Sequence, residues 1–446
     1  VGKGKRDTVF GHIADRFGSS LRYDHDAGSW YEWIGDRWRR DGTGLAYSRC
    51  RAIARELSEE LDAKVRATAR RAGFAAGVEK LARTDRAHAV TQESWDTDHF
   101  KLGVPGGVVD LKIGQLEAPD PDLGITKQAA VAPTLQADCP LWLQFLQEAT
   151  AGDAGMIEFL KRWCGYCLTG DTREHALIFL HGPGGNGKSV FLNTVTRILG
   201  DYATTAAMDT FTATPGDKHP TDLAMLRGAR MVSASETEEG RAWAEARIKQ
   251  MTGGDPITAR FMYKNFFTFT PAFKLTIVGN HAPALANVDE AAKRRFNIVP
   301  FVVEPEKPDR QLEAKLEAEW PGILRWMIDG AVAWQQSGLE RPESVKAATT
   351  SYFNEQDLTA QWLAECCTVA PGDESVWATA GELFESWSWF ARENGEAAGT
   401  TKAFAPRLRR HGVRSGRKKI NGKQSRVWVG VSINLQAPDR VTGDTW

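Results

Sequence analysis

The run Gly182-Pro183-Gly184-Gly185-Asn186-Gly187-Lys188-Ser189 constrains the fold of this chain more than any other feature. It has the spacing G-x-x-x-x-G-K-[S/T] and lies between an apolar run, Ala176–His181, and a helical run, Val190–Leu199. Glycines let backbone N–H groups turn inward around phosphate oxygens, and the amino end of the next helix adds a favourable partial charge. The sequence therefore predicts a phosphate-binding loop, Gly182–Val190, that binds ATP. Lys188 would contact the β- and γ-phosphates, and the Ser189 hydroxyl would bind Mg²⁺.

Three further runs in the same region supply candidate catalytic groups. An apolar run ends in Ser235 and is followed by Glu236, whose carboxylate would hold Mg²⁺ or polarise the attacking water. Most nucleotide-driven motors have Asp at the position of Ser235, so it stays open which group completes the metal site. A second apolar run ends at Asn280, which would bond the γ-phosphate or, alternatively, only cap the strand. Arg295, before the run to Phe301, would act as an arginine finger in a neighbouring subunit or would be a surface charge.

A Gly-Gly-Asp-Pro turn at residues 253–256 precedes a stretch with aromatic and basic residues at its tip. In a ring, such a hairpin would face the central pore. Lys264 would contact a phosphate there, and Tyr263 or Phe266 would pack against a sugar or base. Arg260 and Asn265 flank this tip and complete the candidate DNA contacts. The alternative is an ordinary sheet hairpin with an exposed lysine.

The length of 446 residues and the residue pattern predict three regions. Residues 1–138 are expected to be an α+β domain, with hairpins at Ser29–Arg40 and Gly107–Leu116 and a helical stretch at Arg51–Ala82. Residues 139–344 alternate apolar strands and helices, which is typical of an α/β sheet covered on both faces. Residues 345–446 contain three helical segments and a hairpin with Gly422-Lys423 as its turn, the pattern of a winged helix.

The charge distribution adds a candidate DNA surface. Residues 401–428 contain no acidic residue and ten Lys or Arg, although the net charge of the whole chain is −1. Such a block favours binding to polyanions over a solvated basic tail, because apolar residues are interleaved with it. Arg407, Arg410 and Lys418 are the candidate contacts.

Other classes of protein are disfavoured. Six cysteines do not make a disulfide framework, and the Cys164/Cys167 pair lies in a helical run without a second pair at zinc spacing, so a packed helix is expected. No run of eighteen apolar residues occurs, which predicts no membrane association. A reducing cytoplasm, bacterial or that of a phage-infected host, is the expected location. The chain begins with Val1, so a further upstream domain is also considered.

On these residues the chain resembles superfamily 3 DNA helicases, specifically the poxvirus-type and phage/plasmid primase-helicases. The region from Phe10 to Asp171 resembles the domain that precedes the motor in that family. The resemblance implies a hexameric AAA+ ring with ATP sites between subunits, single-stranded DNA in the pore and movement from 3′ to 5′. It also implies the roles of the matching positions: Lys188 and Ser189 bind nucleotide and Mg²⁺, Glu236 is the catalytic acid, Asn280 the sensor, Arg295 the finger and Lys264 the pore residue. The motifs that carry it are Gly182–Ser189, Ser235–Gly240, Ile248–Lys249, Thr252–Asp255, Ala259–Arg260, Phe269–Lys274, Asn280–Pro283 and Arg294–Arg295.

The predicted fold is therefore α/β, an AAA+ P-loop NTPase motor with an α+β N-terminal domain and a C-terminal winged-helix domain. The predicted function is an ATP-dependent, ring-forming helicase acting on single-stranded and forked DNA. Its expected partners are its own copies in a homo-hexamer and a primase or polymerase. Three alternatives stay open: an ATP-switched origin-binding scaffold, an inactive helicase relative that only binds nucleic acid, and a small-molecule kinase.

Overall fold

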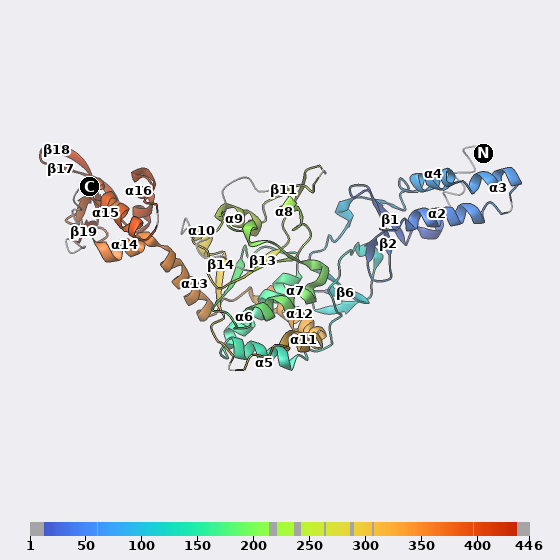
Figure 1. Ribbon diagram of the computed structural model, residues 1–446, viewed down its shortest axis with the longest axis horizontal. Helices are drawn as coiled ribbons and strands as arrows, with labels where there is room; N and C mark the ends of the chain where they lie inside the picture. Colours follow the sequence, from blue (N-terminus) through green and yellow to red (C-terminus); the bar gives the residue numbers. More distant parts are fainter. Residues whose placement is uncertain are drawn as a thin grey trace, which may run out of the picture. The chain divides into compact units, whose positions relative to one another are not determined.

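The computed structural model describes residues 13–434 except for 60, 214–220, 236–241, 263–264, 286–289, 306 and 396. The chain divides into two compact units, and their elements are labelled in Figure 1. Unit 1 comprises residues 1–286 and 294–346, and unit 2 comprises residues 287–293 and 347–446. No helix in the described ranges is long and apolar enough to cross a membrane.

Unit 1 begins with a small sheet and the helices α2 to α4. The sheet has the strand order β3-β2-β1-β4, and the predicted hairpin is confirmed by the antiparallel pairing of Trp33 with Trp38. The predicted helical stretch at 51–82 is interrupted, because the Asp62 side chain accepts the backbone N–H groups of Lys64 and Val65 and so starts a new helix. The elements are β1 Leu21–Asp24, β2 Ser29–Trp33, β3 Trp38–Arg40, α2 Leu45–Glu56, α3 Ala63–Ala69, α4 Ala72–Ala82 and β4 Ala89–Val90.

A second antiparallel sheet, β5-β6-β7, belongs to the main hydrophobic core of unit 1. Its strands are β5 Lys101–Val104, β6 Gly107–Asp110 and β7 Gln115–Glu117, so the hairpin predicted at 107–116 is confirmed and β5 is an addition. Leu102 and Val109 are fully buried in the same cluster as the helices that follow. A Cβ on Gly103 would lie 2.3 Å from the Lys127 carbonyl oxygen, so this strand requires a glycine where the chain passes closely.

The centre of unit 1 is a five-stranded parallel sheet with the order β14-β8-β13-β10-β9. Four of its strands lie where apolar runs predict them, and β9 at the edge is an addition. This is a mixed α/β fold with a parallel sheet consistent with a P-loop-type domain. Its strands are β8 Leu177–His181, β9 Ala203–Thr205, β10 Met231–Ser235, β13 Lys274–Gly279 and β14 Phe296–Pro300.

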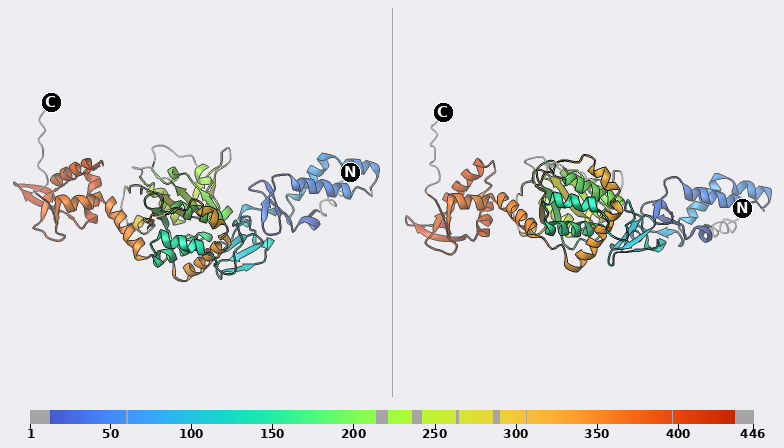
Figure 2. Two further views of the ribbon diagram at one scale, coloured as in Figure 1. Left: turned by 60° about the horizontal axis from the view of Figure 1, so that its bottom comes forward. Right: turned by 90° about the horizontal axis from the view of Figure 1, so that it is seen from below.

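Helices cover this sheet, as Figure 2 shows from two sides. α6 and α12 pack on one another, and Trp163 of α6 donates to Thr276 of β13 over 3.0 Å. Cys164 and Cys167 are buried free thiols in α6. The remaining elements are α5 Pro140–Ala149, α6 Ala154–Leu168, α7 Lys188–Leu199, α8 Thr221–Ala224, α9 Glu245–Gly253, β11 Ile257–Ala259, β12 Phe267–Phe269, α11 Leu312–Glu317 and α12 Trp320–Ser337.

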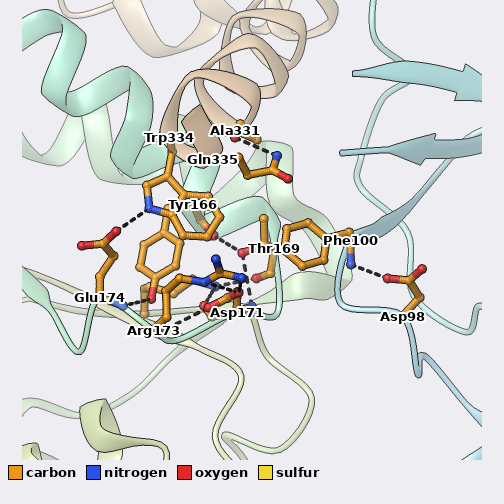
Figure 3. A network of polar contacts seen from close by, with 11 residues as sticks. Asp98, Phe100, Tyr166, Thr169, Asp171, Arg173, Glu174, Ala331, Trp334 and Gln335 are labelled. Carbon is orange, nitrogen blue, oxygen red and sulfur yellow. Dashed lines mark hydrogen bonds and ion pairs between the residues drawn. The ribbon is translucent and has the colours of Figure 1, made fainter. Parts of the chain in front are cut away.

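The connection from α6 to β8 is fixed by a polar network (Figure 3). Trp334 of α12 donates to Glu174 over 2.8 Å, and the Glu174 backbone N–H donates to the Tyr166 hydroxyl over 3.3 Å. The fully buried Lys274 ammonium donates to the carbonyl oxygens of Thr169, Asp171 and Ala272, and burial lowers its pKa to about 7. These contacts fix the start of β13 and of the strand that leads to the phosphate-binding loop.

Unit 2 has its own core, formed around Trp362, Trp387 and Phe404 of its helices. The three predicted helices and the basic hairpin are confirmed, but the turn lies at Asn421-Gly422 and not at Gly422-Lys423. Both turn residues have positive φ, 47° and 81°, as an Asn-Gly hairpin turn requires. The elements are α10 Glu290–Lys293, α13 Glu343–Gln356, which runs from unit 1 into unit 2, α14 Leu358–Cys366, β15 Cys367–Val369, β16 Trp377–Thr379, α15 Ala380–Glu393, α16 Thr401–Arg410, β17 Arg414–Ile420, β18 Lys423–Val429 and β19 Val431–Ile433.

Candidate nucleotide-binding site

The phosphate-binding loop follows β8 and ends in α7, in the strand-loop-helix arrangement that the motif predicts. Two of its glycines are required by their surroundings. A Cβ on Gly182 would lie 1.9 Å from the Phe301 carbonyl oxygen, and one on Gly187, which has a φ of +85°, would lie 2.6 Å from the Phe145 ring. The backbone can therefore approach β14 and α5 only because these side chains are absent.

The Lys188 side chain is held inside this loop and is 4% exposed. Its ammonium donates to the carbonyl oxygens of Gly182 over 2.8 Å and Pro183 over 2.6 Å, and to Asn186 Oδ1 over 2.8 Å. Burial lowers the pKa of Lys188. The Asn186 amide in turn donates to the Phe301 carbonyl oxygen, which connects the loop to the end of β14.

A cavity of about 670 Å³ opens over the loop. Its floor is formed by residues 184–190, which include Ser189. One wall is α5, with Phe145 and Glu148, and the other is the segment after β14, with Lys307 and Asp309. An apolar surface with a few polar groups at its edge is typical of a small-ligand pocket. Sequence reasoning missed both walls, because no local pattern marks residues that meet the loop only in the folded chain.

Polar groups at the ends of two neighbouring strands reach the same cavity. Ser235 ends β10 and Asn280 follows β13, and both line the cavity. β13 lies between β8 and β10, so all three strand ends meet at one edge of the sheet. Glu236, the predicted catalytic acid and metal ligand, lies outside the described residues.

Arg295 lies at the opposite edge of the sheet from the loop. It immediately precedes β14, whose residues Phe296 to Pro300 pair in parallel with Leu177 to His181 of β8, while the loop follows His181. Five residues of strand span roughly 16 Å, so Arg295 is separated from its own chain's cavity by the length of the sheet. Within one chain the structure does not bring the predicted finger to the nucleotide site.

The predicted pore hairpin is present as the antiparallel pair β11–β12. At its tip the Arg260 guanidinium lies over the Phe266 ring, 4.8 Å from the centroid, and Asn265 is exposed. Tyr263 and Lys264 lie outside the described residues. The side chains of Met262 and Phe266 are about 60% exposed, so this tip presents apolar as well as basic groups.

The three predicted DNA contacts of unit 2 are in different surroundings. The Arg407 guanidinium lies over the Trp387 ring at 5.5 Å. Lys418 lies over the Trp377 ring at 5.1 Å and donates to the Glu374 carbonyl oxygen over 2.8 Å. Arg410, at the end of α16, is exposed. Arg407 and Lys418 therefore contact aromatic rings inside the unit.

Comparison with known proteins gives two family matches. Residues 11–151 match the family described as "D5 N terminal like", and residues 180–295 match a "Family of unknown function (DUF5906)". Two viral relatives are named as helicases. "Putative helicase 022R" of Frog virus 3 (isolate Goorha) is 25% identical over 53% of this chain and 26% of its own length. "Putative helicase L207/L206" of Acanthamoeba polyphaga mimivirus is 24% identical over 60% of this chain and 31% of its own length.

Among solved structures, the A form apo structure of the NrS-1 C-terminal region is similar to this chain, with a TM-score of 0.54 and 12% identity. The match covers 95% of this chain and 98% of that one, and at this identity it concerns the fold alone. The chain spans about a quarter to a third of the length of the two viral relatives. The two family matches and the viral relatives together support a D5-like primase-helicase family for this chain.

Proposed function

We propose that this chain is an ATP-dependent, ring-forming DNA helicase of a phage or plasmid-like replication system. In this proposal unit 1 contains an AAA+ motor of superfamily 3, and unit 2 is a winged-helix DNA-binding domain. The motor forms a homo-hexamer, moves on single-stranded DNA from 3′ to 5′ and works with a primase or polymerase. The observation that carries the proposal is the shared cavity of the phosphate-binding loop, Ser235 and Asn280.

The residues of the cavity fit ATP and Mg²⁺. Gly182 and Gly187 let the loop approach Phe301 and Phe145, where a Cβ would collide, and Lys188 lies at the centre of the loop. The Ser189 hydroxyl would hold Mg²⁺ together with Glu236, and Asn280 would orient the attacking water. Bound Mg²⁺ would neutralise developing charge on the phosphates. Lys188 would exchange its carbonyl partners for phosphate oxygens, and the apolar wall of α5 would exclude water from the base.

The names of the two viral relatives support the proposal of a helicase over that of a small-molecule kinase. Both viral relatives carry the word helicase in their names. The basic block at residues 401–428 also favours a nucleic-acid ligand, whereas a kinase should phosphorylate a metabolite without DNA present.

The central test is strand separation on tailed duplexes of each polarity. Lys188→Ala should abolish ATP-dependent unwinding while the thermal unfolding transition is retained. Lys346→Ala, which removes an exposed lysine paired with Glu343, is the matched control and should unwind like the parent chain. Unwinding that survives Lys188→Ala would disprove the proposal.

The position of Arg295 allows a separate test of the ring. Because Arg295 lies far from its own cavity, it would complete the site of a neighbouring subunit. Lys188→Ala and Arg295→Ala should each be inactive alone. Mixed together they should recover part of the ATP turnover, since some interfaces then combine an intact lysine with an intact arginine. Mixtures that stay as inactive as either variant would rule out a shared site.

An ATP-switched DNA scaffold is the second candidate, favoured by Ser235 at the position where most such motors have Asp. Lys264→Ala distinguishes the two. A motor should lose unwinding with this variant, whereas a scaffold should keep its ATP-dependent DNA binding.

A further inference from the structure

The hairpin β17–β18 of unit 2, labelled in Figure 1, has two different faces. Side chains alternate between the faces of a strand, so Arg414 and Lys418 belong to one face. On that face Lys418 already has partners within the unit, because it contacts Trp377 and the Glu374 carbonyl oxygen. Arg417, Lys419 and Arg426 belong to the other face and are exposed. These three residues are called the hairpin face below.

The cations of the hairpin face are close together and have no ion-pair or hydrogen-bond partner among the described residues. Arg417 and Arg426 are direct cross-strand partners in the ladder. Lys419 lies two residues along, a separation of roughly 7 Å, and the strands are about 5 Å apart. Like charges directly opposite one another destabilise a hairpin. An anion bound on this face would offset that repulsion.

The hairpin face continues toward α16. Trp428 lies on the same face as Arg426, and its ring is 4% exposed. The Arg409 guanidinium, in the last turn of α16, lies over this ring at 5.9 Å from the centroid. Arg409 at the end of the helix therefore adds a cation beside the hairpin face, and residues 401–428 contain no acidic residue.

The chemistry of these cations favours duplex DNA over a single strand. Proteins that hold single strands combine cations with aromatic rings on which bases stack. In the described part of the hairpin face the one aromatic ring, Trp428, is buried and covered by Arg409. Exposed cations without a stacking surface contact phosphates and read no sequence.

We infer that Arg417, Lys419 and Arg426, with Arg409 at their edge, bind the phosphate backbone of duplex DNA without sequence preference. Lys418 is not among these contacts, because it lies on the opposite face and has partners inside the unit. The inference rests on the proposed function only in that the ligand is DNA. In a helicase such a face would hold the duplex that awaits separation.

The test is the equilibrium binding of a fluorescent 25-base-pair duplex to the full chain. Binding is measured by fluorescence anisotropy between 50 and 300 mM salt, without nucleotide. Each lost phosphate contact reduces the steepness of the plot of log K against log salt by about 0.9. Arg417→Gln and Arg426→Gln should each weaken binding about eightfold at 100 mM salt, which follows from the same slope. Arg417→Lys should retain most of the affinity, because a point charge still contacts a phosphate.

The matched control is Arg414→Gln, which removes the same charge from the same strand but from the opposite face. It should leave both affinity and slope nearly unchanged. Equal losses with Arg414→Gln and Arg417→Gln would overturn the inference, because net charge alone would then explain them. A loss confined to single-stranded DNA, or no loss with any hairpin-face variant, would also overturn it.

A second readout excludes simple misfolding. Without DNA, Arg417→Gln should raise the thermal midpoint slightly at low salt, because it relieves the repulsion with Arg426. A variant that loses affinity while gaining stability is folded. The measurement contains no nucleotide, so its outcome is independent of whether the chain hydrolyses ATP or unwinds DNA.

Discussion

The two units use positive charge in opposite ways. In unit 1 the important cations are buried: Lys188 is 4% exposed, and Lys274 is 1% exposed. Each donates to three acceptor oxygens fixed by the fold. In unit 2, Arg417 and Arg426 are exposed opposite one another, without such acceptors among the residues that the structure describes. A buried cation is costly unless it is bonded, whereas an exposed one costs little and is screened by salt.

This difference separates two kinds of phosphate recognition. A buried cation binds one ligand in one orientation, because the hydrogen bonds to its ammonium group also fix the position of that group. An exposed row of cations attracts any polyanion and gives affinity that depends on salt. ATP binding by this chain should therefore depend weakly on salt, and duplex binding should depend on it strongly.

The largest expected effect comes from breaking the geometry around the buried cation. In Gly182→Ala the new methyl group would lie 1.9 Å from the Phe301 carbonyl oxygen, so the loop must move away from β14. A displacement near 1 Å of groups that position a reactant lowers the reaction rate roughly 100-fold. Steady-state ATP turnover should fall by at least this factor, and titration with a fluorescent ATP analogue should show weaker binding.

Gly77→Ala, in α4 and outside the cavity, is the control. A Cβ there meets nothing within 4 Å, and no positive φ opposes it. Its ATP affinity should stay within about threefold of the parent chain, because neither the loop nor Lys188 has to move. If both alanine variants bind ATP equally well, the close approach to β14 is not what positions Lys188.

The next effect concerns the pH dependence of stability. The pKa of Lys274 is about 7 in the fold against 10.5 for an ordinary lysine. Between these values the unfolded chain carries a proton that the folded chain has lost, so the free energy of unfolding rises with pH. From pH 7 to 8.5 the parent chain should gain about 1.5 kcal/mol relative to Lys274→Met.

Urea unfolding of both proteins at several pH values checks this. The range ends at pH 8.5, because burial raises the pKa of Cys167 in the folded chain to about 12. At higher pH this thiol would ionise in the unfolded chain alone, which would favour unfolding. The comparison with Lys274→Met cancels contributions from other groups. A difference between the two proteins that stays constant over this range would mean that Lys274 keeps its proton in the fold.

Much of the fold follows from the sequence because local patterns determine it. Buried parallel strands appear as short apolar runs, and the phosphate-binding loop has a fixed spacing between a strand and a helix. The strands that escape prediction are short ones. β9, Ala203–Thr205, has no apolar run, and β5, Lys101–Val104, is only four residues long and is buried by contacts from distant parts of the chain.

The candidate site also has residues that the local sequence marks and residues that it does not. Lys188 and Asn280 are marked by their position after strands, and both line the cavity. Phe145 and Glu148 line it too, yet nothing near α5 in the sequence connects them with a phosphate loop some forty residues away. The faces of the hairpin depend on its register. The Asn421-Gly422 pair was the available signal for that register, since Asn-Gly favours a two-residue turn.

The smallest effect tests whether Lys418 is structural. In Lys418→Met the hydrogen bond to the Glu374 carbonyl oxygen and the contact with the Trp377 ring are lost, while a similar apolar stem remains. One neutral-acceptor hydrogen bond and one exposed cation–π contact are each worth about 0.5 to 1 kcal/mol. Thermal unfolding of the full chain should show a transition destabilised by about 1 kcal/mol, with duplex affinity at 100 mM salt reduced less than twofold. The opposite result, unchanged stability with an eightfold loss of affinity, would place Lys418 on DNA and would erase the distinction between the two faces of the hairpin.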